Sequence, residues 1–535
     1  MSTDLTTFAG LLSTIEDPNG RELLDPATGE VVGRTREGST ADIDTAVAAA
    51  RKAQSDWASR SSKERSELLN KAADAVEASA EALAELLSRE QGKPLNGPNA
   101  RFEVGACAAW LRANAAFALE PEILVDDEDT HAELHYKAVG VVGAVGPWNW
   151  PMMISVWQFA PSLKMGNTVV LKPSEYTPLS VQALVAVINQ VLPADVLTVV
   201  PGSGEVGAAL TSHEDIDKIM FTGSTKTGQA IMRSAADTLA RLTLELGGND
   251  AGIVLENADP AAIAGDLFWG AFINTGQTCA AMKRLYVPES LYDQVCDALV
   301  EVAKQSPMGV GLEEENVLGP LQNKAQYDIV AKLVQAAKDG GARVLTGGDP
   351  VADQPGYFYP TTLVADIDND NPLVAEEQFG PVLPIIKYTD LEQAIGWANE
   401  LEVGLGSSVW GSDLEECKTV AARLQAGSTW INKHGAVDPR IPFGGVKNSG
   451  FGLEFGLEWL KQVSVLHVFI CYGCSLCELC RARTASASEQ PSYAEVIHST
   501  NMPSGPSSAR RRPGVVKTLT DQGESASYRP RCQSQ

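Results

Sequence analysis

From Val139 onward, short runs of β-branched residues alternate with segments of helical periodicity. The runs lie at 140–145, 168–171, 196–199, 218–221 and 242–244, and the helical segments at 179–191, 204–211 and 227–236. Such alternation predicts βαβ units, and therefore a parallel sheet with helices on its faces. A sheet of this kind binds ligands at the carboxyl ends of its strands. Polar residues at those ends are therefore the candidates for a functional site.

A second set of alternating patterns follows Cys279. Its strands are expected near 284–287, 344–346, 382–387 and 428–431, and its helices near 291–304, 324–339 and 391–400. This set predicts a second α/β domain. The chain before Val139 is dominated instead by helical periodicity over 41–58, 62–89 and 101–119.

Charge and cysteine usage limit the classes of function. The 535 residues carry a formal net charge of -26 at pH 7, which disfavours nucleic acid as a partner because phosphate would be repelled. The start of the chain lacks the basic and apolar regions of a secretory signal, and no long uninterrupted apolar run precedes the C-terminal region. Cys107, Cys279, Cys296 and Cys417 are scattered through the body, which favours a reducing compartment. We therefore expect a cytoplasmic protein with neither a membrane nor a nucleic-acid partner.

Polar residues follow the first two strands of the predicted sheet. Gly-Pro-Trp-Asn-Trp-Pro, residues 146–151, contains two prolines that fix the backbone around Asn149, so its amide can be held rigidly. By itself this segment is equally typical of a structural loop. Lys172 and Glu175 lie one short turn apart after strand 168–171. A carboxylate there can accept from ribose hydroxyls, and an ammonium can donate to one.

Two more polar segments at strand ends, and one cysteine, are also candidates for the functional site. Residues 221–228, Phe-Thr-Gly-Ser-Thr-Lys-Thr-Gly, end a strand and open a helix, where N–H groups can approach a pyrophosphate, although the spacing is not GxGxxG. Glu245 ends the next strand, and a single glutamate is usually a surface acid. Cys279 closes the small-residue turn Asn-Thr-Gly-Gln-Thr-Cys. A lone cysteine is more often a buried apolar side chain than a nucleophile.

Together these segments resemble the aldehyde dehydrogenase superfamily. The motifs are, in order, Pro-Trp-Asn-Trp-Pro, Lys-Pro-Ser-Glu, Phe-Thr-Gly-Ser, Glu-Leu-Gly-Gly, Gly-Gln-Thr-Cys, Glu-Gln-Phe-Gly-Pro (377–381) and Pro-Phe-Gly-Gly-Val-Lys-Asn-Ser-Gly (442–450). Each is weak alone, but their order and spacing match over residues 20–468. The resemblance implies an α/β fold made of a Rossmann-like NAD-binding domain, a second α/β catalytic domain and a small β oligomerisation arm. The NAD-binding domain would comprise 20–121 and 139–245, the catalytic domain 246–432, and the arm with a pocket-closing segment 122–138 and 433–468.

The resemblance implies three catalytic residues. Cys279 would attack the aldehyde carbonyl as a thiolate and form a thiohemiacetal. The Asn149 amide and the Cys279 backbone N–H would stabilise its oxyanion. Hydride transfer to the nicotinamide would leave a thioester, and Glu245 would activate the water that hydrolyses it. Since relatives that pass the acyl group to coenzyme A typically lack this glutamate, Glu245 favours a free carboxylic acid as product.

The resemblance also implies a nicotinamide cofactor and no metal. Lys172 and Glu175 would hold the adenosine ribose, while Glu377 would bind the nicotinamide ribose with Phe379 packed against it. A carboxylate at Glu175 should repel a 2′-phosphate, so NAD is expected, with NADP possible. The cofactor-binding residues implied are Val145, Pro147, Trp148, Lys172, Ser174, Glu175, Gly204, Phe221, Thr222, Gly223, Ser224, Leu246, Glu377 and Phe379.

The substrate pocket would be lined by Ile154, Trp157, Thr278 and the segment 434–439. This lining is mainly apolar, and no arginine immediately follows the nucleophile, so we expect an uncharged small aliphatic or aromatic aldehyde. A single histidine such as His434 is more typical of a solvent-facing position than of a substrate contact. Two alternatives stay open: a coenzyme A-acylating semialdehyde dehydrogenase, and a catalytically silent scaffold.

The last part of the chain departs from the family. A final strand over 462–468 would pair with another subunit, together with 122–138, which predicts a homodimer or homotetramer. The Ser/Pro/Arg-rich composition of 469–535 predicts a disordered, non-homologous tail. Its Cys471, Cys474, Cys477 and Cys480 are spaced as in some zinc or iron–sulfur sites, but the usual wider gap is missing. An extension without a metal is the favoured interpretation.

Overall fold

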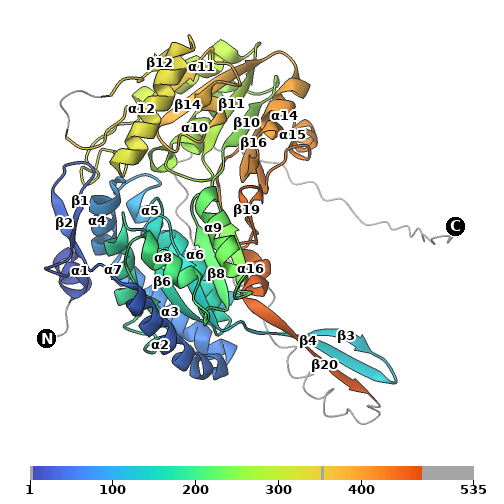
Figure 1. Ribbon diagram of the computed structural model, residues 1–535. Helices are drawn as coiled ribbons and strands as arrows, with labels where there is room; N and C mark the ends of the chain where they lie inside the picture. Colours follow the sequence, from blue (N-terminus) through green and yellow to red (C-terminus); the bar gives the residue numbers. More distant parts are fainter. Residues whose placement is uncertain (1–3, 351–354, 473–535) are drawn as a thin grey trace, which may run out of the picture. The chain divides into compact units, whose positions relative to one another are not determined.

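The computed structural model describes residues 4–350 and 355–472 (Figure 1). Of these, residues 4–126, 131–350 and 355–470 form one compact unit. The turn 127–130 and residues 471 and 472 belong to a second unit. Within that turn, the Asp127 N–H donates to the Thr130 carbonyl over 3.0 Å. No helix in the described ranges is long and apolar enough to cross a membrane.

The N-terminal part is mainly helical, as predicted. It contains α1 (Phe8–Ile15), β1 (Arg21–Leu24), β2 (Val31–Thr35), α2 (Thr40–Ser59), α3 (Ser62–Ala78), α4 (Ala80–Gln91) and α5 (Ala100–Ala116). Capping boxes start two helices, with Ser39 and Asp42 at α2 and Ser61 and Glu64 at α3. The single helix predicted over 62–89 is wrong, because the chain breaks at Ser79 into α3 and α4. Serine competes for backbone hydrogen bonds and therefore favours helix ends.

The first sheet has six strands in the order β19-β9-β8-β5-β6-β7. Its elements are β5 (Val141–Val145), α6 (Pro151–Lys164), β6 (Thr168–Lys172), α7 (Pro178–Ile188), β7 (Leu197–Val199), α8 (Gly204–Thr211), β8 (Lys218–Thr222), α9 (Thr225–Ala235), β9 (Arg241–Glu245) and β19 (Gly450–Phe451). Strands β5 to β9 pair in parallel, as predicted. Helices α2, α8 and α9 cover one face, and α6 and α7 cover the other. The sequence analysis did not anticipate β19, which pairs antiparallel with β9 and sets Gly450 opposite Glu245.

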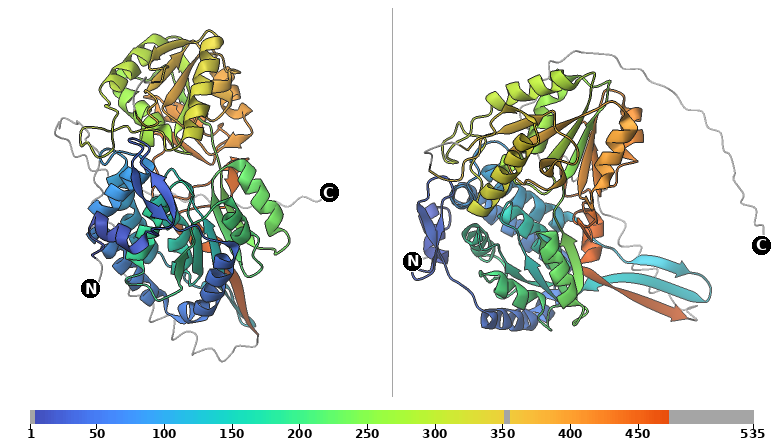
Figure 2. Two further views of the ribbon diagram at one scale, coloured as in Figure 1. Left: turned by 60° about the vertical axis from the view of Figure 1, so that its left-hand side comes forward. Right: turned by 45° about the horizontal axis from the view of Figure 1, so that its top comes forward.

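The second sheet has seven strands in the order β12-β13-β14-β11-β10-β16-β17. Its elements are β10 (Asp250–Val254), α10 (Pro260–Phe272), β11 (Met282–Pro288), α11 (Tyr292–Lys304), α12 (Lys324–Asp339), β12 (Arg343–Thr346), β13 (Thr362–Ala365), α13 (Pro372–Ala375), β14 (Val382–Tyr388), α14 (Leu391–Glu400), β16 (Gly406–Trp410), α15 (Leu414–Ala421) and β17 (Ser428–Ile431). All neighbours are parallel except β12 and β13. Helices α10 and α11 pack on one face, and α12, α14 and α15 on the other (Figure 2). The predicted α/β fold with two parallel-sheet regions is therefore present.

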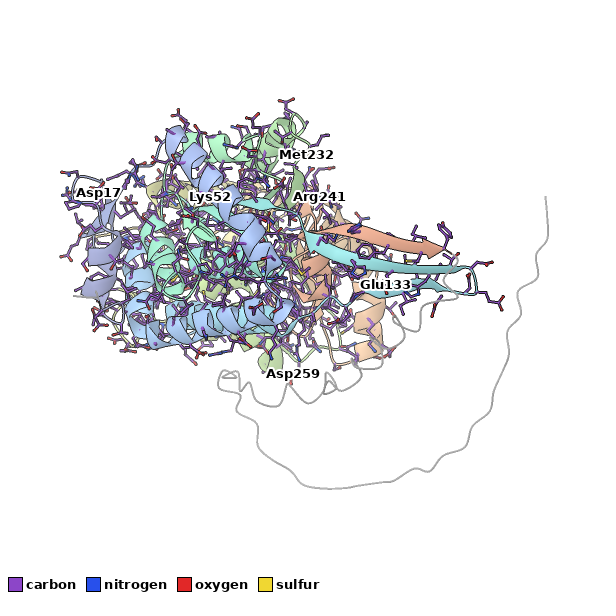
Figure 3. All side chains as sticks on the ribbon, turned by 90° about the horizontal axis from the view of Figure 1, so that it is seen from below. Asp17, Lys52, Glu133, Met232, Arg241 and Asp259 are labelled. Carbon is purple, nitrogen blue, oxygen red and sulfur yellow. The ribbon has the colours of Figure 1, made fainter. Side chains whose placement is uncertain are left out.

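A third sheet, the arm, consists of β3 (Glu122–Asp126), β4 (Thr130–Ala138) and β20 (Ser464–Tyr472), in the order β20-β4-β3. Figure 3 labels Glu133, which lies on β4 of this sheet. The prediction of a disordered tail from residue 469 is wrong for 469–472, since β20 continues to Tyr472 and the Phe469 ring packs 4.5 Å from that of His135. Cys471 is exposed and free. Cys474, Cys477 and Cys480 lie outside the described residues.

Short elements connect these sheets. They are the 3₁₀ turn η1 (Ile273–Gly276), β15 (Val403–Gly404), β18 (Val446–Lys447) and α16 (Gly456–Gln462). The η1 turn links α10 to the segment that carries Cys279, and β18 pairs with β15. The segment around 446–451 therefore contacts both α/β regions.

Candidate active site

Four strands of the first sheet end at one edge. Val145 lies opposite Lys172 on β6 and opposite Phe221 on β8, while Thr222 lies opposite Glu245 on β9. Neighbouring ends are tied together, because the Gly146 N–H donates to the Lys172 carbonyl over 3.1 Å and the Gly223 N–H donates to the Glu245 carbonyl over 3.0 Å. The residues predicted from four separate motifs therefore share one edge of one sheet, as a ligand site in a parallel sheet requires.

The Lys172 ammonium is available to a ligand. Its side chain is buried, and its stem lies against α8, where a Cβ added to Gly207 would come 3.8 Å from the Lys172 Cδ. Burial lowers the pKa of Lys172, and the Glu175 carboxylate raises it. Among the described residues the ammonium has no hydrogen-bond partner. Ser174 shapes the turn that follows, since its hydroxyl accepts from the Tyr176 N–H over 3.3 Å. Lys172 and the half-buried Glu175 therefore fit a diol such as ribose.

The start of α9 presents backbone N–H groups at the same edge. Ser224 is the N-cap, and its hydroxyl accepts from the Thr227 N–H over 3.3 Å. The Thr222 hydroxyl accepts from Gln158 over 3.2 Å, which fixes the end of β8. The helix packs closely at Gly228, because a Cβ there would lie 2.6 Å from the Leu246 Cδ2 and the Leu246 side chain would have to shift. This arrangement fits a pyrophosphate. Gly204 is the first residue of α8, and Gly207 on the same helix lies against the Lys172 stem.

Glu377 and Phe379 lie in the connection between α13 and β14 of the second sheet, and they face the strand-end edge of the first sheet, where Phe379 contacts Trp148. A Glu377 carboxylate oxygen lies 3.1 Å from the Lys283 ammonium, and burial raises the pKa of Glu377 while Lys283 lowers it. The Phe379 ring stands edge-on to the Trp148 ring, with centroids 5.3 Å apart, and its backbone has a φ of 46°. A non-glycine residue at such a φ is strained, which is typical of a constrained functional position.

The turn before Cys279 is strained and firmly held. Asn274 and Thr275 have φ values of 50° and 58°, both in the left-handed region. The Thr275 hydroxyl accepts from the Gly319 N–H over 2.9 Å, and the Asn274 amide donates to the Asn149 carbonyl over 2.8 Å. The Gln277 side-chain oxygen accepts from the Gln322 N–H over 2.9 Å. Such contacts can hold a backbone conformation that costs about 1–3 kcal/mol per strained residue.

Cys279 is partly accessible and packs against the core cluster that contains Ile154 and Trp157. Burial raises the pKa of its thiol to about 12, and among nearby charges Lys283 lowers it. A thiol with this pKa is protonated at neutral pH, so its conversion to a thiolate requires a further change in the surrounding charge.

Asn149 is joined to the nucleophile turn. Its side-chain amide donates to the Gln277 carbonyl over 2.9 Å, so in this arrangement one of its two amide protons is already engaged. Its backbone carbonyl accepts from the Lys93 ammonium over 2.7 Å as well as from Asn274. Lys93 also pairs with Glu103. Neither Lys93 nor Glu103 was predicted from the sequence, because no motif marks a buried lysine as paired.

Glu245 is buried at the end of β9, and neither carboxylate oxygen has a hydrogen-bond partner among the described residues. Burial and the Glu454 carboxylate both raise the pKa of Glu245 well above its usual value. Burial likewise raises the pKa of Glu454 to about 8. Glu454 was not predicted from the sequence; it pairs antiparallel with Phe443 and acts on Glu245 at the end of β9. Two interacting carboxyls in a dry site lose their protons in separate steps.

The expected pocket residues occupy an aromatic region. Ile154 and Trp157 are buried on α6, and the Trp157 ring centroid lies 4.8 Å from that of Phe455, which the sequence analysis did not single out. The half-buried Thr278 accepts from the Trp150 indole N–H over 2.9 Å. The expectation of a solvent-facing His434 is wrong: it is buried, and its Nδ1 lies 2.8 Å from the Ser408 hydroxyl.

Comparison with known proteins agrees with this geometry. Residues 15–468 match the family model described as the aldehyde dehydrogenase family. The putative aldehyde dehydrogenase DhaS of Bacillus subtilis is 39% identical over 452 residues, which are 83% of this chain and 89% of DhaS. Geranial dehydrogenase of Castellaniella defragrans is 38% identical over 442 residues, covering 82% of this chain and 92% of the relative. The NAD⁺ complex of an aldehyde dehydrogenase from Bacillus cereus superposes with a TM-score of 0.81 at 37% identity, covering 84% of this chain and 93% of that one. The chain therefore belongs to the aldehyde dehydrogenase family, and it is an oxidoreductase that acts on aldehydes with NAD(P).

Proposed function

We propose that this protein oxidises an uncharged small aliphatic or aromatic aldehyde to its carboxylic acid with NAD. The observation that carries the proposal is the Glu245 carboxyl. It is buried at the strand-end edge, and within residues 4–350 and 355–472 neither of its oxygens has a hydrogen-bond partner. An unpaired buried acid is costly to the fold, so it is expected where a reaction needs a base.

Cys279 and Asn149 perform the first step. The Cys279 thiolate attacks the carbonyl carbon, and the carbonyl electrons move to oxygen, giving a thiohemiacetal. The amide proton of Asn149 that does not bond Gln277, together with the Cys279 N–H, stabilises the oxyanion. Lys93 and Asn274 fix the Asn149 backbone, so the donor does not have to reorganise as charge develops.

The edge of the first sheet fits NAD. Lys172 and Glu175 would hold the adenosine ribose, the N–H groups after Ser224 the pyrophosphate, and Glu377 the second ribose. When bound, the cofactor supplies a hydride acceptor. The Glu175 carboxylate supports NAD over NADP, because it would repel a 2′-phosphate.

Glu245 performs the last step. Its carboxylate takes a proton from water, and the resulting hydroxide attacks the thioester carbonyl, so that the carboxylic acid forms and the Cys279 thiolate leaves. The raised pKa of Glu245 makes it a strong base once it is ionised.

The surroundings of the nucleophile support an apolar substrate. Ile154, Trp157 and Phe455 belong to the same apolar cluster that packs against Cys279. The relative from Castellaniella defragrans is named a geranial dehydrogenase, and geranial is an uncharged aldehyde. We extend this class, without a specific aldehyde, to the present chain.

A panel of aliphatic, aromatic, amino and semialdehyde substrates tests the proposal, with NADH formation and acid production as readouts. Uncharged aldehydes should be the best substrates, and Cys279→Ala should abolish NADH formation. Glu245→Gln should release about one equivalent of NADH per active site and then stall. NADH formation that depends on added coenzyme A would favour the acylating alternative, and full activity in Cys279→Ala would remove the nucleophile assignment.

The cellular setting is also proposed. The scattered free cysteines Cys107, Cys296 and Cys417 support a cytoplasmic location, since all three are buried and unpaired. The exposed apolar residues on β20 support a homodimer or homotetramer built through the arm.

A further inference from the structure

The Lys283 ammonium lies between the nucleophile turn and the predicted cofactor site. It donates to the Cys279 carbonyl over 2.6 Å and to the Thr278 carbonyl over 2.9 Å. On its other side it lies 3.1 Å from the Glu377 carboxylate. The Lys283 side chain is 2% exposed and Glu377 29% exposed, so a ligand can approach the carboxylate while the ammonium stays dry.

The charges that act on the Cys279 thiol differ in sign. Lys283 favours the thiolate, whereas the carboxylates of Asp250, Glu377 and Glu245 oppose it. Lys283 is hydrogen-bonded to the backbone of Cys279 itself, so its position relative to the thiol is fixed by the turn. In a site with little water, such a charge has a larger effect than it would at the surface.

We propose that Lys283 is a positioning residue that couples the cofactor site to the nucleophile: its ammonium fixes the turn and favours the Cys279 thiolate, and Glu377 controls how much of that charge the sulfur experiences. This inference rests on the proposed function, because it takes Cys279 as the nucleophile. No bond is formed or broken by Lys283, and its own proton stays on the ammonium.

The coupling follows from the shared carboxylate. In the free enzyme, Glu377 partly neutralises Lys283 across 3.1 Å. Hydroxyl groups that donate to Glu377, as ribose hydroxyls would, draw the negative charge away from Lys283. The ammonium then acts on Cys279 with less compensation. Cofactor binding and thiol ionisation would therefore favour each other, as linked equilibria must.

Thiol ionisation measures this coupling directly in the free enzyme. The rate of iodoacetamide alkylation of Cys279 is followed from pH 6 to 11, with the modified peptide resolved by mass spectrometry because Cys471 is also exposed. Lys283→Met should raise the apparent pKa of Cys279 by about one unit and slow alkylation at pH 8 by about tenfold. Lys283→Arg keeps the charge and should restore most of the rate. Lys304→Met removes an equally charged but exposed lysine and should change nothing.

Glu377→Gln should shift the apparent pKa of Cys279 in the opposite direction, and it leaves the hydrogen bonds from Lys283 to the Thr278 and Cys279 carbonyls in place. It should lower the apparent pKa of Cys279 by about half a unit and speed alkylation about threefold in the free enzyme. Because the Glu377 carboxylate also opposes the thiolate directly, part of this acceleration does not need Lys283. Coupling through the ammonium predicts that Glu377→Gln accelerates alkylation less when Lys283 is already replaced by Gln than when Lys283 is present. If Lys283→Met fails to fold, Lys283→Gln takes its place.

The failure of this inference can be distinguished from failure of the proposed function. An unchanged alkylation profile in both Lys283→Met and Glu377→Gln, or a slower rate in Glu377→Gln, would overturn the coupling while leaving Cys279 as nucleophile. Loss of NADH formation in Cys279→Ala tests the nucleophile independently. If that variant stays active, the proposed function fails first.

Discussion

The Lys93 ammonium and the Glu103 carboxylate form an ion pair of 2.6 Å in which neither side chain is exposed. The ammonium also donates to the Asn149 carbonyl and lies 3.6 Å from the centroid of the Trp150 ring. The other Glu103 oxygen accepts from the Met152 N–H, in the first turn of α6, over 2.9 Å. The pair therefore ties α5 to the backbone that carries the predicted oxyanion donor.

Removing one partner of this pair should destabilise the protein strongly. Lys93→Met or Glu103→Gln leaves an uncompensated or poorly satisfied buried group, which costs about 3–5 kcal/mol. The double variant Lys93→Met/Glu103→Gln should lose less than the sum of the two. Differential scanning calorimetry of the four proteins measures this, and additive losses would contradict the pairing.

Hydrolysis of the thioester should depend on pH through Glu245. A general base acts when deprotonated, so the rate rises as pH rises through its pKa, which burial and Glu454 raise. Glu454→Gln removes the neighbouring negative charge, and the rise should move to lower pH by about one unit. Stopped-flow measurement of the steady phase after the NADH burst detects the shift. Glu458→Gln, an exposed change nearby, serves as control.

Cofactor choice should change at Glu175. Glu175→Gln removes the carboxylate expected to repel a 2′-phosphate while keeping an acceptor for a ribose hydroxyl. The ratio of kcat/KM for NADP to that for NAD should rise about tenfold, which corresponds to about 1.4 kcal/mol. Initial rates with both cofactors measure the ratio. An unaltered ratio would mean that another group selects the cofactor.

The fold should be less stable at pH 8 than at pH 5 because of Glu90. Burial raises the pKa of Glu90 from 4.5 to about 7, although its carboxylate accepts from the Leu179 and Ser180 N–H groups. Between these values the unfolded chain ionises while the folded protein keeps its proton, so stability falls as pH rises. The loss is on the order of 3 kcal/mol and is complete above the folded pKa. Glu90→Gln should flatten the dependence of Tm on pH, and an equally steep dependence would exclude Glu90 as its source.

Assembly should depend on the apolar surface of β20. Leu466 is 65% exposed, and Val468 and Ile470 on the same strand are also exposed. Leu466→Asp should lower the molar mass in light scattering, because a carboxylate would be buried without a partner. Leu239→Asp, at a residue 87% exposed outside the arm, should leave the mass unchanged. An unaltered mass in both variants would assign the interface elsewhere.

The pattern of β-branched runs was enough to predict the parallel strands β5 to β9 of the first sheet and the edge at which Lys172 and Glu245 lie. It failed for β10, β13 and β16. These strands are short, and their glycine, serine and threonine content weakens the signal, although burial on both faces stabilises them.

Some residues of the candidate site could likewise be predicted from the sequence, and others could not. Motifs marked Cys279 and Asn149, since their types and spacing are local properties. Glu454 and the pair of Lys93 and Glu103 depend on contacts between distant segments, and a local pattern cannot distinguish a buried charge from a surface one. The burial of His434 also depends on a contact between distant segments, because its ring nitrogen lies against the Ser408 hydroxyl.

The late position of β19 in the sequence affects how the chain folds during synthesis. The outer edge of β9, where Glu245 lies, is paired by Gly450 and Phe451, which are made about 200 residues later during synthesis. Until then, the edge of an otherwise formed sheet presents unpaired N–H and C=O groups to any other strand. The ribosome-bound chain is therefore most exposed to mispairing at the strand that carries its predicted base.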